Sequence, residues 1–151
     1  MPSGAGAGEQ PSAAAGTATN VLDLRLSQIS RPSWTWSGAD GRWVRAERGV
    51  PALEANGTPL RAVNVVVLRV DVVLTPYTDA IGTHVPETVM VSSGEAIVAT
   101  GGRTVAATWS KASVTAPVVL TGADGQPIRL APGNTWVELV PKGTGSVRAI
   151  P

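Results

Sequence analysis

The stretch SSGEAIVATGGRTVAATWSK, residues 92–111, places runs of alternating apolar and polar residues on either side of Gly101-Gly102. A second stretch, ADGQPIRLAPGNTWVELVP, residues 123–141, repeats the alternation and carries turn signals at Asp124-Gly125 and Pro132-Gly133. Alternation with a period of two is typical of half-buried strands, and Gly-Gly between two such runs favours a tight hairpin turn. The last third of the chain is therefore predicted to form short strands joined by hairpins.

The same pattern extends towards the N-terminus. Residues 21–27 place three leucines on one face of a predicted strand, and Trp36 and Trp43 flank an Asp40-Gly41 turn across which we expect them to pair. Residues 65–74 form the strongest predicted strand, with its first half covered on both faces and its second half exposed on one. Residues 76–86 are expected to form an irregular connection.

We find no sustained helical stripe of apolar residues. Roughly eight to ten short strands, spaced about 8–12 residues apart, predict an all-β fold, an antiparallel hairpin-rich sandwich or open barrel. Residues 1–19 are almost wholly Gly, Ala, Ser, Thr and Pro, which predicts a flexible tail or linker. Residues 20–151 are expected to form a single β domain.

Composition excludes several classes of protein. Twelve Lys and Arg balance eleven Asp and Glu, so we expect no nucleic-acid partner, which would require a clustered basic face. The chain has no Cys and a single His, so no metal site and no cofactor is expected. No stretch approaches the ~20 apolar residues of a membrane span, and the first residues lack the features of a signal peptide.

No arrangement of residues predicts catalysis, and we expect no catalytic residues. His84 is the only imidazole, and the sequence has no Gly-x-Ser-x-Gly elbow that could present a nucleophile. Glu87, Glu95 and Glu138 are the carboxylates on which a glycoside hydrolase would have to rely. Sparse acidic residues beside turns are usually solvated, so that alternative is the weaker one.

Tryptophan offers the clearest functional hint, because the chain has five Trp, one Tyr and no Phe. Trp34, Trp36 and Trp43 lie close together in sequence, with Arg42 and Arg45 among them. Exposed Trp and Arg side chains commonly anchor a sugar ring or a protein partner. These five residues are our candidate ligand- or partner-binding residues, although the same tryptophans could instead fill the core.

The order and spacing of several motifs resemble the C-terminal domain of the YerB-like bacterial lipoprotein family. The motifs span residues 34–140 and include Trp36, Gly41-Arg-Trp43-Val-Arg45, Asn56-Gly57, Ala62-Val-Asn64, Gly101-Gly102, Thr108-Trp109-Ser-Lys111 and Pro132-Gly133-Asn-Thr-Trp136. The composition is similar to that of a high-GC actinobacterial member. Family members resemble one another in a lipidated, exported N-terminus and a preceding domain, and their biochemical role is uncharacterised.

The resemblance implies an extracytoplasmic, cell-envelope location for the parent protein, although this sequence has no lipobox Cys. We therefore expect a non-enzymatic envelope domain that interacts with a missing N-terminal domain or with another envelope protein. Such a module would expose an apolar patch of several hundred Å². Two alternatives stay open: a domain that binds glycan or peptidoglycan through exposed Trp, and a carboxylate-based glycoside hydrolase.

Overall fold

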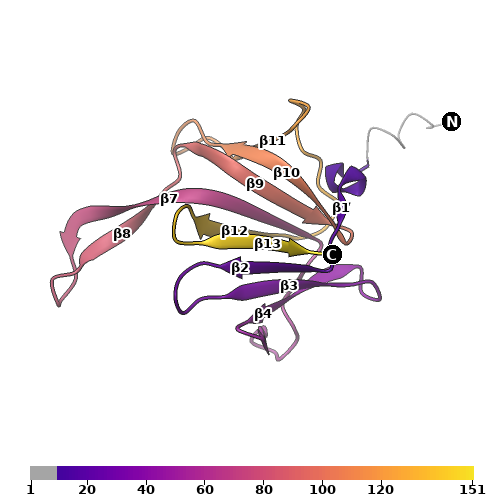
Figure 1. The fold of residues 1–151 in the computed structure, drawn as a ribbon, viewed down its shortest axis with the longest axis horizontal. Coiled ribbons are helices and arrows are strands. Elements are labelled where there is room, and N and C mark those ends of the chain that lie inside the picture. The colour runs from indigo at the N-terminus through magenta and orange to yellow at the C-terminus, as the bar shows by residue number, and fades with distance from the viewer. Residues whose placement is uncertain (1–9) are drawn as a thin grey trace.

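Two β-sheets face each other in residues 10–151, the part of the chain that the computed structural model describes (Figure 1). Sheet A has the strand order β1-β10-β9-β7-β12, with β11 beside β10 and β8 beside β7. Sheet B has the order β13-β2-β3-β4-β5, with β6 beside β4. The two sheets remain separate and do not close into a barrel, so the predicted all-β fold is confirmed in its sandwich form.

The strands are short, apart from β7. Sheet A contains β1 (Thr17–Ala18), β7 (Asn64–Thr78), β8 (His84–Val89), β9 (Ser93–Thr100), β10 (Arg103–Ser110), β11 (Val119–Gly122) and β12 (Thr135–Pro141). Sheet B contains β2 (Val21–Arg25), β3 (Pro32–Ser37), β4 (Arg42–Glu47), β5 (Val50–Pro51), β6 (Arg61–Ala62) and β13 (Ser146–Ile150). A 3₁₀ turn, η1 (Ser12–Ala15), precedes β1.

The predicted hairpins at Asp40-Gly41 and Gly101-Gly102 are present, whereas residues 128–130 after the Asp124-Gly125 turn form no strand and leave only a single bridge between Thr121 and Pro127. β9 and β10 pair antiparallel around Gly101 and Gly102, both of which have the positive φ that a tight turn requires. Trp36 lies opposite Trp43 across the β3–β4 hairpin, and their rings are 5.3 Å apart between centroids. One pairing departs from the antiparallel pattern, because β12 runs parallel to β7.

Sheet A is covered on both faces, which makes it the central layer of the domain. Val65 and Val67 of β7 pack towards sheet B, in a core that includes Leu22, Leu24 and Trp34. The alternate residues of β7, together with Val98 and Trp109, form a second core on the opposite face, where side chains such as Leu120 and Ile128 cover them. The first half of β7 is therefore buried on both faces, as the sequence predicted.

Beyond Val70, β7 leaves the sandwich and pairs only with β8. Residues 71–89 form a projecting two-stranded hairpin, the β7–β8 arm, which extends from the left of the domain in Figure 1. The expectation of an irregular connection at residues 76–86 was wrong, because β7 continues to Thr78 and β8 begins at His84. The second half of β7 is exposed on both faces rather than one, since neither sheet B nor the second core reaches it.

The N-terminal boundary also differs from the prediction. Residues 1–9 of the expected tail lie outside the described residues, but residues 10–19 pack against sheet A through η1 and β1. Ala13 is fully buried, and the Ser12 hydroxyl accepts a hydrogen bond from the Arg129 N–H at 2.7 Å. Small residues that look like a linker can dock when backbone hydrogen bonds, rather than apolar area, hold them in place.

Asn64, at the start of β7, fastens the loop that precedes β12. Its side chain is fully buried, with Nδ2 donating to the Ala131 carbonyl at 2.9 Å and to the Thr135 hydroxyl at 3.2 Å. Its Oδ1 accepts from the Thr100 hydroxyl at 2.8 Å and from the Ala131 N–H at 3.1 Å. The one amide therefore satisfies polar groups of β9 and of residues 131–135.

We expect Asn64→Ala to lower the free energy of unfolding by about 2–4 kcal/mol, because buried polar groups that lose their partner cost about 1–3 kcal/mol each. Asn56→Ala is the matched control, since the Asn56 side chain accepts hydrogen bonds from Thr58 in an exposed turn. Its expected cost is below about 1 kcal/mol. Urea denaturation measures both values, and equal effects would contradict the anchoring role of Asn64.

Candidate functional site

The predicted Trp and Arg cluster lies mainly inside the sandwich. Trp34 and Trp43 have no exposed surface, and Trp36 is half-buried beside Gly102. Of the two arginines, Arg42 is exposed at the start of β4 and Arg45 is half-buried. Complete burial of Trp34 and Trp43 leaves them no surface to offer a ligand, and Trp36 and Arg42 remain as the accessible members of the cluster.

Arg45 instead links the two sheets through a buried carboxylate. Its Nη2 lies 3.4 Å from Oε2 of Glu138, a β12 residue that is only 5% exposed. The other oxygen, Oε1, accepts a hydrogen bond from the Trp136 indole N–H at 2.8 Å. The guanidinium lies 5.5 Å from the Trp136 ring centroid and 5.9 Å from that of Trp34. Such an arrangement stabilises a charge that burial would otherwise penalise.

The three carboxylates considered for hydrolysis lie in three different settings. Glu138 is committed to Arg45 and Trp136, as described above. Glu87 lies on the exposed β8 strand of the arm, while Glu95 lies on β9 at the edge of a groove. His84, the only imidazole, is on the arm, where its Nδ1 is 2.8 Å from the Thr75 carbonyl oxygen. The fold therefore does not bring His84 together with the buried carboxylate of Glu138.

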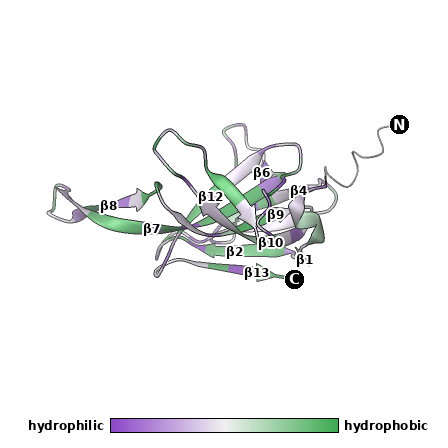
Figure 2. Ribbon diagram, turned by 90° about the horizontal axis from the view of Figure 1, so that it is seen from above, coloured by the Kyte–Doolittle hydropathy of each residue, from purple (hydrophilic) through white to green (hydrophobic). Residues whose placement is uncertain are grey.

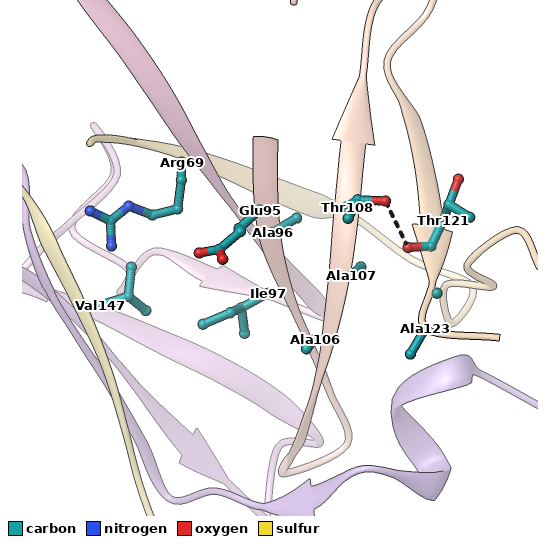
Figure 3. Close-up of a pocket in the computed structure, with 11 residues that line it drawn as sticks. Arg69, Glu95, Ala96, Ile97, Ala106, Ala107, Thr108, Thr121, Ala123 and Val147 are labelled. Atoms are coloured by element: carbon teal, nitrogen blue, oxygen red, sulfur yellow. Dashed lines mark hydrogen bonds between the residues drawn. The ribbon is translucent and has the colours of Figure 1, made fainter. Parts of the chain in front are cut away.

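The groove lies on the face of sheet A that faces sheet B, beside Val147 of β13, and it encloses about 510 Å³. Figure 3 shows Arg69 and Glu95 at one end of it, near Val147 and Ile97, and the two threonines Thr108 and Thr121 at the other. The Thr108 hydroxyl donates to the Thr121 carbonyl at 3.4 Å, a bond that joins β10 to β11. Small residues line part of the groove, among them Ala106, which is exposed on β10.

Arg69 is the fixed charge of this groove. Its Nη2 donates to the carbonyls of Pro141 at 3.2 Å and Gly145 at 3.1 Å, which anchors it to the turn between β12 and β13. Its Nε is buried and has no hydrogen-bond partner among residues 10–151. Glu95 forms no ion pair within the same residues, so the groove holds one cation and one anion that are not paired with each other. This arrangement offers polar contacts but no proton-transfer relay.

The most exposed apolar surface lies on the β7–β8 arm, which the sequence did not identify as a site. Leu74 is 71% exposed, Tyr77 75% and Ile81 87%, and Val72, Val73 and Val85 are each more than two-fifths exposed. Figure 2 shows β7 coloured as hydrophobic into the arm. A signal was present in the sequence, since the apolar run that begins at Val65 continues past residue 70 and residues 70–102 contain neither Lys nor Arg.

No group of three or more His, Asp or Glu side chains lies close enough together to hold a metal ion in residues 10–151. None of the helical segments within these residues is long and apolar enough to cross a membrane.

The structural class is a β-sandwich in which sheet A is covered on both faces and a hairpin projects from one end. The family follows from comparison with known proteins. The profile described as "Protein of unknown function (DUF3048) C-terminal domain" matches residues 22–137. The chain therefore belongs to this family, as its C-terminal domain. The resemblance stated from the sequence is confirmed by this match.

A solved structure shares the fold. The crystal structure of YerB protein from Bacillus subtilis superposes with a TM-score of 0.69 at 18% sequence identity. The match covers 89% of this chain and 45% of the YerB chain, so this chain corresponds to less than half of YerB. No curated protein matches the sequence. The fold and the family are thus known, whereas the activity is a matter for proposal.

Proposed function

We propose that this domain is a non-enzymatic protein-interaction module and that it binds its partner through the β7–β8 arm. The observation that carries the proposal is the exposure of Leu74, Tyr77 and Ile81 on a hairpin that no other part of residues 10–151 covers. Large apolar side chains gathered on one projection usually mark a binding surface. A two-stranded hairpin is also only marginally stable by itself in water, so a bound partner would stabilise the arm.

The arm is better suited to a protein than to a lipid surface. Its charged side chains are Asp71, Asp79 and Glu87, and it carries no Lys or Arg. Bacterial membranes usually present anionic headgroups, which attract basic segments and repel acidic ones. The similarity to exported lipoproteins supports a location at the cell envelope, where the partner would be another envelope protein or the remainder of the parent protein.

The proposal of glycan binding receives less support from the structure. Two of the three clustered tryptophans are fully buried, and the third is half-buried. Sugar recognition by stacking requires an exposed aromatic face. The hydrolase alternative also receives less support, because Glu95 lines the groove without Glu87, which lies on the arm, and because Glu138 is bound by Arg45 and Trp136.

Photocrosslinking from two equally exposed positions tests the proposed function. We expect a benzophenone amino acid at Ile81, which is 87% exposed on the arm, to give a discrete protein adduct in the native envelope. The same group at Val114, which is 81% exposed in the loop after β10, is the matched control and should give none. The adduct should also disappear when Leu74→Ser and Tyr77→Ser remove apolar contacts.

Mass spectrometry of the adduct identifies the protein and the residue that was captured. Adducts of equal yield from Ile81 and Val114, or an Ile81 adduct that survives the two serine substitutions, would contradict a specific role for the arm. The absence of any adduct from Ile81 would have the same meaning.

A further inference from the structure

We propose that β13 is a docking edge, at which an extended segment of another protein adds as a further strand of sheet B and fills the groove beside it. The segment carries small apolar side chains on the face towards sheet A and acidic side chains on the opposite face. This inference goes beyond the proposed function, because the surface is separate from the β7–β8 arm. Three features carry it: an unpaired strand edge, a groove of matching shape, and an excess of arginine beside the edge.

β13 is the last strand of sheet B, and within residues 10–151 it pairs only with β2. Two hydrogen bonds show which way the backbone of β2 points. The Trp36 N–H donates to the Asn20 carbonyl at 2.8 Å, just before β2 begins. The Leu26 N–H donates to the Ser30 carbonyl at 2.9 Å, just after β2 ends. Because backbone groups alternate between the two sides of a strand, the even-numbered residues of β2 face β3 and the odd-numbered residues face β13.

The same alternation leaves every second residue of β13 without a strand partner. Arg148 lies opposite an odd-numbered residue of β2 and bonds to it, whereas Val147 and Ala149 direct their N–H and C=O groups to the uncovered side. The Gly145 carbonyl points the same way, and it already accepts a hydrogen bond from Arg69 Nη2 at 3.1 Å. Pairing with a new strand would therefore begin at Val147. An uncovered edge of this kind is a template for another strand.

Sheet A extends past the β13 edge, so the two sheets form a step there. Ala149 lies opposite Leu22 of β2, which is fully buried, and residues opposite each other on antiparallel strands share a face. Ala149 therefore points towards sheet A, yet it is exposed. The exposure arises because sheet B has no strand beyond β13 to close the sandwich at this point.

The groove of about 510 Å³ lies at this step. Figure 3 shows Val147 on one side of it and Thr121 and Ala123 on the other, with Ala106 between them. Ala106 and Thr108 of β10 are exposed in the groove. Strands lie about 4.8 Å apart within a sheet and packed sheets about 10 Å apart, so a strand added at β13 would lie above β10. Its inward side chains would share that layer with Ala and Thr, which suits small or β-branched apolar residues.

Arginine is in excess on the face of β2 and β13 that points away from sheet A. A second hollow, of about 450 Å³, is lined by Arg25, Arg31 and Arg148, and Asp23 is the one carboxylate among its lining residues. Arg148 is 73% exposed and pairs with Asp23 at 3.4 Å, while Arg25 and Arg31 form no ion pair within residues 10–151. An acidic side chain on the outer face of the added strand would lie beside Arg148, and opposite charges on neighbouring strands attract.

These observations select the chemistry of the partner. Only a polypeptide offers N–H and C=O groups at the spacing of a strand edge, and strand addition is a common mode of peptide recognition. The groove selects small apolar residues for one face of that segment, and the arginines select acidic residues for the other.

Hydrogen exchange of the chain by itself tests the unpaired edge. We expect the Val147 and Ala149 amides to exchange with solvent at least about ten-fold faster than the Arg148 amide, which bonds to β2. NMR spectroscopy measures the three rates separately. Equal protection of all three amides would show that the edge is already covered and would overturn the proposal.

A synthetic peptide tests the docking. The probe is a blocked peptide of about seven residues, close to the usual length of a strand, in which Val alternates with Glu. We expect it to slow the exchange of the Val147 and Ala149 amides and to leave that of Arg148 unchanged. A peptide in which Lys replaces Glu is the matched control and should bind at least about ten-fold more weakly, because it places like charges beside Arg148.

Ala149→Pro removes the outward N–H without removing a bond to β2, and proline is tolerated where the N–H of an edge strand faces solvent. It should weaken binding of the Glu peptide at least about ten-fold, since it removes a donor from the edge and adds a ring that blocks the strand. Ala149→Ser keeps the N–H and the size of the side chain, and should bind as the unchanged chain does. Titration followed by NMR measures both affinities.

A second variant tests the groove even if Ala149→Pro disturbs β13. Ala106→Tyr fills the groove from an exposed position and should weaken peptide binding at least about ten-fold, because it occupies the space of the inward side chains. Val114→Tyr, at a position that is 81% exposed in the loop after β10, is the matched control and should leave binding unchanged.

Several results would overturn the proposal. Equal binding by Ala149→Pro and Ala149→Ser, or unchanged exchange at Val147 and Ala149 with the Glu peptide in excess, would exclude β13 as the docking edge. Equal affinity for the Glu and Lys peptides would exclude an acidic partner. Leu74→Ser and Tyr77→Ser change the arm and should not alter peptide binding, so the roles of the arm and of β13 stand or fall separately.

Discussion

Glu138→Ala is expected to lower the free energy of unfolding by about 3–5 kcal/mol, because it removes one partner of a buried ion pair. The substitution leaves the Arg45 guanidinium, whose side chain is 16% exposed, without its nearest anion. It also leaves the Trp136 indole N–H without its acceptor. Glu47, 4.0 Å from Arg45 and 36% exposed, compensates only in part. Chemical denaturation followed by Trp fluorescence measures the change.

Two control variants distinguish the stability contribution of the buried Arg45–Glu138 pair from that of an ion pair on the surface. Asp23→Ala removes a surface pair with Arg148, in which the side chains are 46% and 73% exposed, and should cost less than about 1 kcal/mol. Arg45→Met combined with Glu138→Leu removes both charges and should recover most of the loss, since apolar replacements of buried pairs are often neutral or stabilising. A loss below about 1 kcal/mol for Glu138→Ala would contradict the linking role.

Trp34→Ala is expected to cost about 3–5 kcal/mol, the range for removing a buried aromatic ring. Trp34 has no exposed surface and lies in the core between the sheets, with the Trp136 ring centroid 5.6 Å away. Trp34→Phe retains most of the apolar volume and should cost less than half as much. If Trp34 is a core residue, the loss of stability depends on the volume of the cavity that the substitution leaves. Alanine should therefore cost more than phenylalanine.

Trp36→Ala is the matched comparison from the same strand, and its half-buried side chain should cost about 1–2 kcal/mol. The same denaturation experiment measures all three variants. A loss for Trp34→Ala as small as that for Trp36→Ala would mean that the ring is not a core element.

The sequence predicted an all-β sandwich or open barrel because the information that specifies short strands and hairpins is local. Gly101-Gly102 between two alternating runs determines a hairpin, and the alternation around Leu22 and Leu24 determines which face is buried. The register of Trp36 opposite Trp43 follows from the turn between them. These features depend only on the alternation of apolar and polar residues and on the residues of the turn, and about ten residues of sequence are enough to recognise both.

The features that the sequence did not predict depend on contacts between distant residues. Arg45 and Glu138 are 93 positions apart, so their pairing appears only once β4 and β12 lie in facing sheets. The arm was missed because Pro76 and the polar residues around it are typical of a loop, whereas the structure accommodates them in an irregular strand pair between Leu74 and Thr78. Likewise, η1 docks through backbone groups that leave little trace in side-chain patterns.

The positions of β12 and β13 determine when each sheet can form its last strand pair during synthesis. β12 closes one edge of sheet A beside β7, and β13 then crosses to sheet B, where it pairs with β2, the first strand of that layer. Sheet A cannot acquire β12 until residue 141 has been synthesised, and sheet B cannot acquire β13 until residue 150 has been synthesised. A nascent chain that is still short of residue 141 therefore holds two sheets with an unpaired edge, and a product terminated there would be prone to aggregate rather than to persist as a smaller version of the domain.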